Sequence, residues 1–152
     1  MRRSKRGLKL ATATHEPGRR IIHPLHAVLL ASSLPLFLGA LLSDWAYSSD
    51  YQVQWLNFAS WLIAGALVLT GAALLWAAID FFRADVEKDR RGALYILVLL
   101  TAFVLGFINA LVHAKDGWAT MPEGLILSVI VFVLALVATW LGYSTLRSGA
   151  TR

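Results

Sequence analysis

Four long apolar stretches, separated by short polar segments, make up most of the chain. They cover about residues 24–42, 56–79, 93–112 and 125–141. A helix needs roughly 20 mostly apolar residues to cross about 30 Å of hydrocarbon. The pattern therefore predicts an all-α membrane protein with four transmembrane helices. Because the connecting segments are short, each helix should run antiparallel to the one before it, in an up-down-up-down bundle.

Polar residues inside the third stretch recur at helical spacing. Gly106, Asn109, Ala110 and His113 fall at positions 0, 3, 4 and 7, which lie on one face of a helix. Small residues let neighbouring helices approach closely, so this face should point into the bundle. Asn109 and His113 should therefore face other helices rather than lipid.

The first stretch carries a similar stripe. Its members are separated by nearly whole helical turns, and they are His26, Ser33, Phe37 and Asp44. Asp44 and His113 each lie about ten residues from the middle of their helices, roughly 15 Å along the axis. We therefore expect them to meet at the same height.

These heights predict two polar clusters at opposite ends of the bundle. Asp44, Asn109 and His113 should form the first cluster together with Asp116. The second should contain His23, His26 and Asp80. For His23 and Asp80 we favour the plain interpretation that they cap or solvate helix ends.

The second and fourth stretches differ in the size of their residues. The second is rich in Gly and Ala, which favours close packing and makes it the expected face for association between copies. The fourth is dominated by Val, Ile, Leu and Phe, with only Ser128 and Thr139 as polar residues inside. We expect it to be the helix most exposed to lipid.

The composition agrees with a membrane protein. Of the 152 residues, 58% are hydrophobic and only 15% are charged, whereas a soluble domain is about one quarter charged. We expect one domain over residues 21–147, with a disordered basic tail at 1–20 and a short tail at 148–152. The absence of Cys excludes thiolate metal sites, iron–sulfur ligation and disulfides.

The net charge of +5 is distributed on one side of the predicted bundle. Lys and Arg precede the first stretch, fill the connection between the second and third, and follow the fourth. The first loop, Ser43–Gln54, has none, and the third loop has only Lys115. Basic residues collect on the cytoplasmic side of membrane proteins with short loops. This pattern predicts cytoplasmic termini and a lipid partner rather than nucleic acid.

Haem is one cofactor that the histidines could hold, because helix bundles often supply axial His ligands. His26 and His113 lie at opposite ends of the predicted bundle, so they cannot ligate the same haem. A haem b at either end would need another ligand. His23 and His26, one turn apart, could contact a single metal whose identity the sequence does not indicate.

Proton or ion handling is a second hypothesis, because ionisable groups in membrane spans are costly and often functional. The pair predicted for it is Asp44 with His113. The sequence contains no phosphate-binding Gly-rich loop, no metalloprotease motif and no spacing typical of a nucleophile with its base. We therefore expect no catalytic activity.

Three segments carry a resemblance to a known family. They are the His23-Pro24-Leu25-His26 entry to the first stretch, residues 109–118, and residues 122–128. In their order and spacing they resemble DUF2231, a bacterial membrane family, over about residues 21–143. The resemblance implies a four-helix protein of the bacterial inner membrane, encoded near membrane-associated sugar-dehydrogenase-like proteins. Lys115-Asp116 departs from the Arg-Asp expected there, so the bidentate fork of an Arg is missing.

Three functions follow from these observations. The first is a non-catalytic membrane subunit or anchor that serves electron transfer with a redox protein at the outer face. The second is a small proton- or ion-coupled transport element that uses Asp44 and His113. The third is a structural membrane protein without a ligand.

Overall fold

The computed structural model describes residues 23–82, 90–115 and 119–147. These residues form four α-helices and no strand: α1 (Pro24–Asp50), α2 (Val53–Phe82), α3 (Arg90–His113) and α4 (Glu123–Arg147). Each helix is long and apolar enough to cross a membrane. The prediction of an all-α fold with four transmembrane helices is confirmed.

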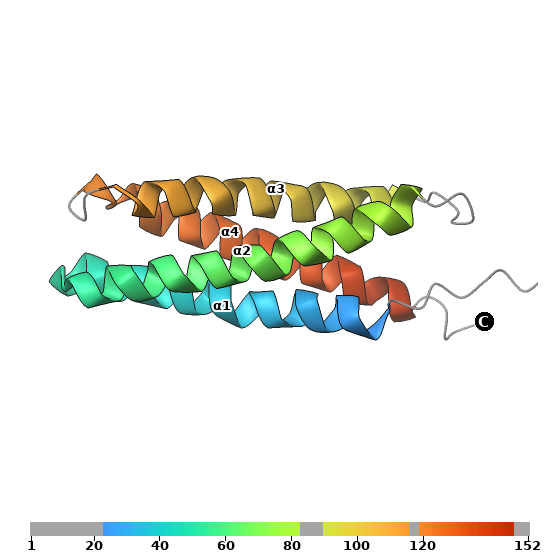
Figure 1. Cartoon of the computed structure of the whole chain (residues 1–152), viewed down its shortest axis with the longest axis horizontal. Coiled ribbons are helices and arrows are strands. Elements are labelled where there is room, and N and C mark those ends of the chain that lie inside the picture. The colour runs from blue at the N-terminus through green and yellow to red at the C-terminus, as the bar shows by residue number, and fades with distance from the viewer. Residues whose placement is uncertain (1–22, 83–89, 116–118, 148–152) are drawn as a thin grey trace, which may run out of the picture.

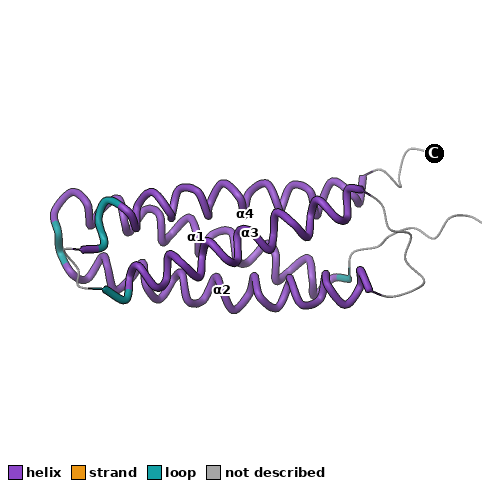
Figure 2. The backbone as a smooth tube through the Cα atoms, turned by 90° about the horizontal axis from the view of Figure 1, so that it is seen from above, coloured by secondary structure: helices purple, strands orange, loops and turns teal. Residues whose placement is uncertain are grey.

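The four helices lie side by side in one elongated bundle (Figure 1). Successive helices run in opposite directions, as the tube in Figure 2 also shows. The main contacts join α1 to α2, α2 to α3, α3 to α4 and α4 to α1. Consequently α1 and α3 lie diagonally across the core from each other and run in the same direction.

The connection between α1 and α2 is much shorter than the sequence indicated. We expected a loop over Ser43–Gln54, but α1 continues to Asp50 and α2 begins at Val53. Tyr51 adopts a left-handed conformation with φ of 54°, and its N–H donates to the carbonyl of Tyr47 at 2.8 Å. This left-handed cap ends the helix in the way that Gly or Asn usually does. The loop prediction was wrong because hydrophobicity marks where hydrocarbon ends, not where the helix ends.

The fourth helix faces the core more than we expected. Its buried positions recur at spacings of three and four, and they are Gly124, Ser128, Val131, Ala135, Ala138 and Gly142. Its apolar window is buried to the same share as those of α1 and α2. The prediction that it is the most lipid-exposed helix was therefore wrong. Small residues form its inner face, and the large branched residues that dominate its composition point outward.

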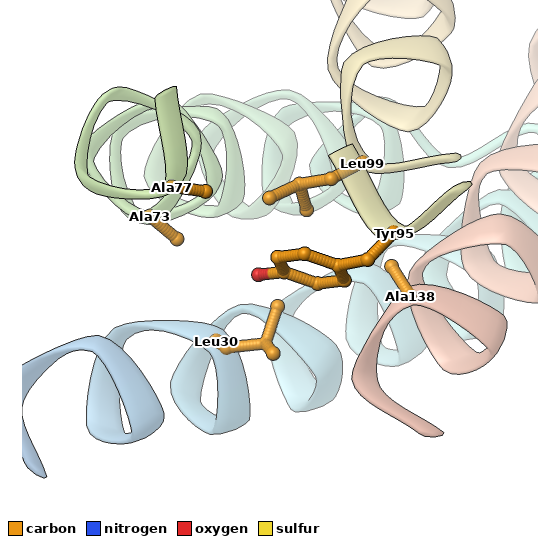
Figure 3. Packing of buried hydrophobic residues seen from close by; sticks show 6 residues of the cluster. All are labelled: Leu30, Ala73, Ala77, Tyr95, Leu99 and Ala138. Carbon is orange, nitrogen blue, oxygen red and sulfur yellow. The ribbon is translucent and has the colours of Figure 1, made fainter. Parts of the chain in front are cut away.

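Two apolar clusters fill the core between the ends of the bundle. The Tyr95 cluster, drawn in Figure 3, consists of Leu30, Ala73, Ala77, Tyr95, Leu99 and Ala138. The Phe37 cluster consists of Phe37, Ala66, Val131 and Ala135. Alanines from α2 and α4 supply much of both clusters, so the helices approach closely around a few large side chains.

Gly106 offers a test of this close packing. A Cβ atom there would lie 3.0 Å from Leu67 Cδ2 and 3.6 Å from both Phe37 Cε1 and Val131 Cγ1. We predict that Gly106→Leu lowers the free energy of unfolding by about 1–3 kcal/mol, because the core has no room for the added atoms. Thermal or denaturant unfolding in detergent, followed by circular dichroism, measures the change.

Gly65→Leu is the matched control for that substitution, because it adds the same side chain at another glycine of the bundle. A Cβ at Gly65 meets only Leu36 Cδ1, at an ordinary contact distance of 3.5 Å. This variant should be as stable as the parent protein. Equal stability of Gly106→Leu and the parent would show that the core is not closely packed at that level.

Candidate functional site

A buried pair of one aspartate and one histidine lies at the end of the bundle where α1 and α3 finish. Asp44 is 0% exposed, and its Oδ1 lies 2.7 Å from Nε2 of His113. The other ring nitrogen of His113, Nδ1, lies 2.9 Å from the backbone carbonyl oxygen of Asn109. The meeting of Asp44 and His113 at one height agrees with the expectation from helical rise.

Helix α4 completes the site with a serine. Ser128 Oγ donates to Asp44 Oδ2 at 2.5 Å and accepts from Asn109 Nδ2 at 2.8 Å. One connected network therefore joins α1, α3 and α4. Because Ser128 gives its only proton to the carboxylate, the amide of Asn109 must face it through nitrogen. Asn109 Oδ1 is buried and has no hydrogen-bond partner among the described residues.

The geometry fixes how many protons the pair holds. A carbonyl oxygen only accepts, so Nδ1 of His113 must carry a proton to bond Asn109. The 2.7 Å contact between Nε2 and Asp44 Oδ1 then needs a second proton, because two lone pairs would repel each other. That proton belongs either to an imidazolium beside a carboxylate or to a neutral carboxyl beside a neutral imidazole. In both forms the pair has no net charge.

Small and polar residues surround the imidazole. A Cβ at Gly124 would lie 3.0 Å from His113 Cε1, so only glycine lets α4 approach the ring this closely.

Nearby, Lys115 Nζ and Glu123 Oε2 are 3.6 Å apart and both side chains are exposed. Such an exposed pair contributes little to stability. Asp116, which we expected in this cluster, lies outside the described residues.

The opposite end of the bundle has a separate set of hydrogen bonds. His26 is 6% exposed, and its Nε2 lies 2.9 Å from the hydroxyl of Tyr95. Tyr143 donates from its hydroxyl to the carbonyl of Ala27 at 2.8 Å. Nδ1 of His26 is buried without a partner among the described residues.

The structure does not bring His23, His26 and Asp80 together as a bonded cluster. His23 is exposed and caps α1, where its Nδ1 accepts from the N–H of Leu25. Its ring also packs on Trp76 with centroids 4.7 Å apart. Asp80 is exposed, and it forms no hydrogen bond to either histidine.

Sequence reasoning missed the parts of the two end sites that come from elsewhere in the chain. It listed Ser128 only as an isolated polar residue, and it did not single out Tyr95 or Tyr143. A signal for Ser128 exists: it belongs to the stripe of small residues that recurs along α4. A signal for Tyr95 exists as well, because it continues the face of Gly106, Asn109 and His113 at spacings of three and four toward the start of α3. Tyr143 has no such signal, since it lies beside and not on the buried stripe of α4.

Comparison with known proteins gives a family and no activity. A model of the family described as "Predicted membrane protein (DUF2231)" matches residues 22–148. No curated protein matches the chain. No solved structure matches it.

The role of Ser128 in the network can be measured. Ser128→Ala would leave Asp44 Oδ2 and Asn109 Nδ2 without their partners. We predict a loss of about 1–2 kcal/mol in the free energy of unfolding, as buried hydrogen bonds between helices contribute in membranes. Reversible unfolding in mixed micelles measures the loss.

Ser43→Ala serves as the control for that variant. Ser43 is also buried, but its hydroxyl donates to Gly39 O within α1. That carbonyl can already accept a helical bond, so the loss should be small. A Ser128→Ala variant no less stable than Ser43→Ala would contradict a network that joins three helices.

Proposed function

Since the chain belongs to the DUF2231 family of predicted membrane proteins, we propose a function that operates within a lipid bilayer. The protein acts as a small proton-coupled transport element, and its Asp44–His113 pair takes up and releases the proton. The pair is the proton-binding site, and Asn109 and Ser128 hold it in position.

One observation supports this proposal above all: His113 Nε2 and Asp44 Oδ1 are buried and lie 2.7 Å apart, a contact that requires one shared proton. Removing that proton leaves one net negative charge in a medium of low dielectric constant, where an isolated charge is very costly. The site must therefore regain a proton, or its helices must move to let water reach the carboxylate. Both responses couple proton binding to the arrangement of α1, α3 and α4.

The distribution of Lys and Arg supports an orientation for the proposed site. The Asp44 end of the bundle is poor in basic residues, whereas the basic segments precede α1 and follow α2 and α4. By the positive-inside rule, the Asp44 end faces the outside of a bacterial inner membrane and both termini are cytoplasmic. The proton then enters from the outer face.

A redox subunit or anchor is supported less well by the same geometry. An axial haem ligand needs a free ring nitrogen, but both nitrogens of His113 are engaged and Nε2 of His26 contacts Tyr95. His23 is exposed, and its Nδ1 accepts from the N–H of Leu25. Among the buried ring nitrogens that the structure describes, only Nδ1 of His26 has no partner. It lies in a tightly packed core beside the Tyr95 cluster, which does not suit a large planar group.

A purely structural clamp is the remaining alternative, and Asp44→Asn separates it from proton coupling. With a neutral His113 protonated on Nδ1, the amide introduced by Asp44→Asn can donate to Nε2 and accept from Ser128. Every hydrogen bond of the network is then kept without an exchangeable proton. A structural role tolerates this change, whereas proton coupling does not.

We therefore predict that Asp44→Asn folds with nearly unchanged stability but loses proton flux. In proteoliposomes with an imposed pH gradient, flux followed by an internal pH dye should fall roughly 100-fold or more, as on loss of a proton-transferring group. His23→Gln is the control, because His23 is exposed and outside the network, and it should retain full flux. Wild-type flux in a folded Asp44→Asn protein would rule out the proposed function.

A further inference from the structure

The Asp44–His113 pair lies close to one end of the bundle, yet both of its side chains are buried. The side chain of Asp44 is 0% exposed and that of His113 is 1% exposed. Helix α3 ends at His113, so no further turn of α3 covers the pair on that side. Other residues must therefore separate the pair from the water at this end of the bundle.

Tyr47 is the largest of the fully buried side chains that the structure describes. It lies three residues after Asp44 on the same buried stripe of α1, about 4.5 Å further along the helix axis. Long side chains of a helix lean back over the turn that precedes them. The ring of Tyr47 is therefore placed to cover Asp44 on the side that faces the end of the bundle.

The exposure of its neighbours shows that Tyr47 is not an aromatic anchor at the membrane surface. Trp45 is 64% exposed and Tyr51 is 46% exposed, whereas Tyr47 is only 2% exposed. Aromatic anchors present their rings to the lipid headgroups. Tyr47 instead belongs to the interior of the bundle, at a level where α3 has already ended.

Two smaller residues form one layer with this ring. Leu56 is buried three residues after the start of α2, and Tyr47 lies three residues before the end of α1, so the short connection places them level. Thr120 is 0% exposed and lies beside the imidazole: a Cβ at Gly124 would be 2.9 Å from Thr120 Cγ2 and 3.0 Å from His113 Cε1. We call Tyr47, Leu56 and Thr120 the cap layer.

The barrier on the other side of the pair is thicker. Between the pair and the opposite end of the bundle lie first the Phe37 cluster and then the Tyr95 cluster. The cap layer is one side chain thick. The shortest route between the pair and water therefore passes through the cap layer.

We infer that Tyr47 is the gate of the proposed proton site: its ring separates the Asp44–His113 pair from the water at the outer face, and the pair exchanges its proton when this ring moves aside. This inference rests on the proposed function. The ring of Tyr47 meets that of Tyr51 in a T-shaped arrangement, with centroids 5.4 Å apart. Because Tyr51 lies in the connection between α1 and α2, the gate is supported on its outer side by an exposed residue.

Tyr47→Ala tests the gate, because it removes the ring and keeps both members of the pair. A water-soluble carbodiimide with an amine labels carboxyl groups that water reaches. Mass spectrometry of the full-length protein, treated in lipid nanodiscs, gives the labelling of Asp44 relative to that of the exposed Asp50. We expect this ratio to rise at least about tenfold in Tyr47→Ala, since Asp44 then reacts without a local opening of the structure.

Two further substitutions at the same position separate the ring from its hydroxyl. Tyr47→Phe keeps the ring, so the labelling ratio should equal that of the parent protein. Tyr47→Leu fills only part of the space, so its ratio should lie between those of Tyr47→Phe and Tyr47→Ala. A ratio as high in Tyr47→Phe as in Tyr47→Ala would contradict a barrier formed by the ring.

Leu30→Ala is the matched control for the loss of a large buried side chain. Leu30 is 1% exposed and belongs to the Tyr95 cluster, about 20 Å along α1 from Asp44. Its removal loosens the bundle without opening the cap layer, so Asp44 should be labelled no more than in the parent protein. An equal rise in Leu30→Ala and Tyr47→Ala would reveal general loosening and overturn the gate.

The gate and the proposed function fail in different experiments. Unchanged labelling of Asp44 in Tyr47→Ala, with proton flux in the parent protein, would overturn the gate and leave the proposed function standing. Absence of flux in the parent protein would overturn the proposed function, and the gate with it, whatever the labelling shows.

Discussion

The buried carboxyl group of Asp44 needs partners that compensate its charge. This need determines how the helices pack at that end of the bundle. In an apolar bundle neither water nor salt can neutralise this group, so protein donors must do so. His113 and Ser128 supply the two contacts, one from α3 and one from α4. The small residues around them, Gly124 above all, follow from this requirement, because the donors reach Asp44 only if the helices pack closely.

Helix α2 is held in the bundle in a different way from the other three helices. At both ends of the bundle, the described interhelical bonds join members of the set α1, α3 and α4: Asp44 with His113 and Ser128 at one end, and His26 with Tyr95 at the other. Helix α2 is held by apolar packing, largely through alanines. Hydrogen bonds specify one geometry, whereas apolar contacts tolerate sliding. The site at Asp44 is therefore formed by the three helices that directional bonds hold together, and α2 packs beside them.

Helical geometry made much of this structure predictable, and its limits explain the errors. Asp44 and His113 could be paired from the sequence because the rise of a helix is fixed, so their distances from the helix centres decide their heights. Asn109 followed from the spacing of small residues on α3. Ser128 was not assigned, because one hydroxyl in an apolar helix changes its hydropathy very little, although it lies on the stripe of small residues along α4. The hydrogen bond between His26 and Tyr95 has the same offset of 69 residues as the contact between Asp44 and His113, so the same helical rise could have predicted it. It was missed because Tyr95 was not counted on the polar face of α3. The continuation of α1 to Asp50 was missed for a further reason: outside hydrocarbon, polar residues can extend a helix as well as apolar ones.

Nitrogen-15 solid-state NMR of His113 in lipid bilayers most directly measures the proton count on which the proposed function depends. Nδ1 should carry a proton in the folded protein, and a second proton should lie between Nε2 and Asp44, either nearer the nitrogen or nearer the oxygen. In Asp44→Asn, Nε2 should appear as a proton-free acceptor while Nδ1 keeps its proton. An unprotonated Nδ1 in the parent protein, or an Nε2 with no proton shared with Asp44, would contradict a buried site loaded with one exchangeable proton.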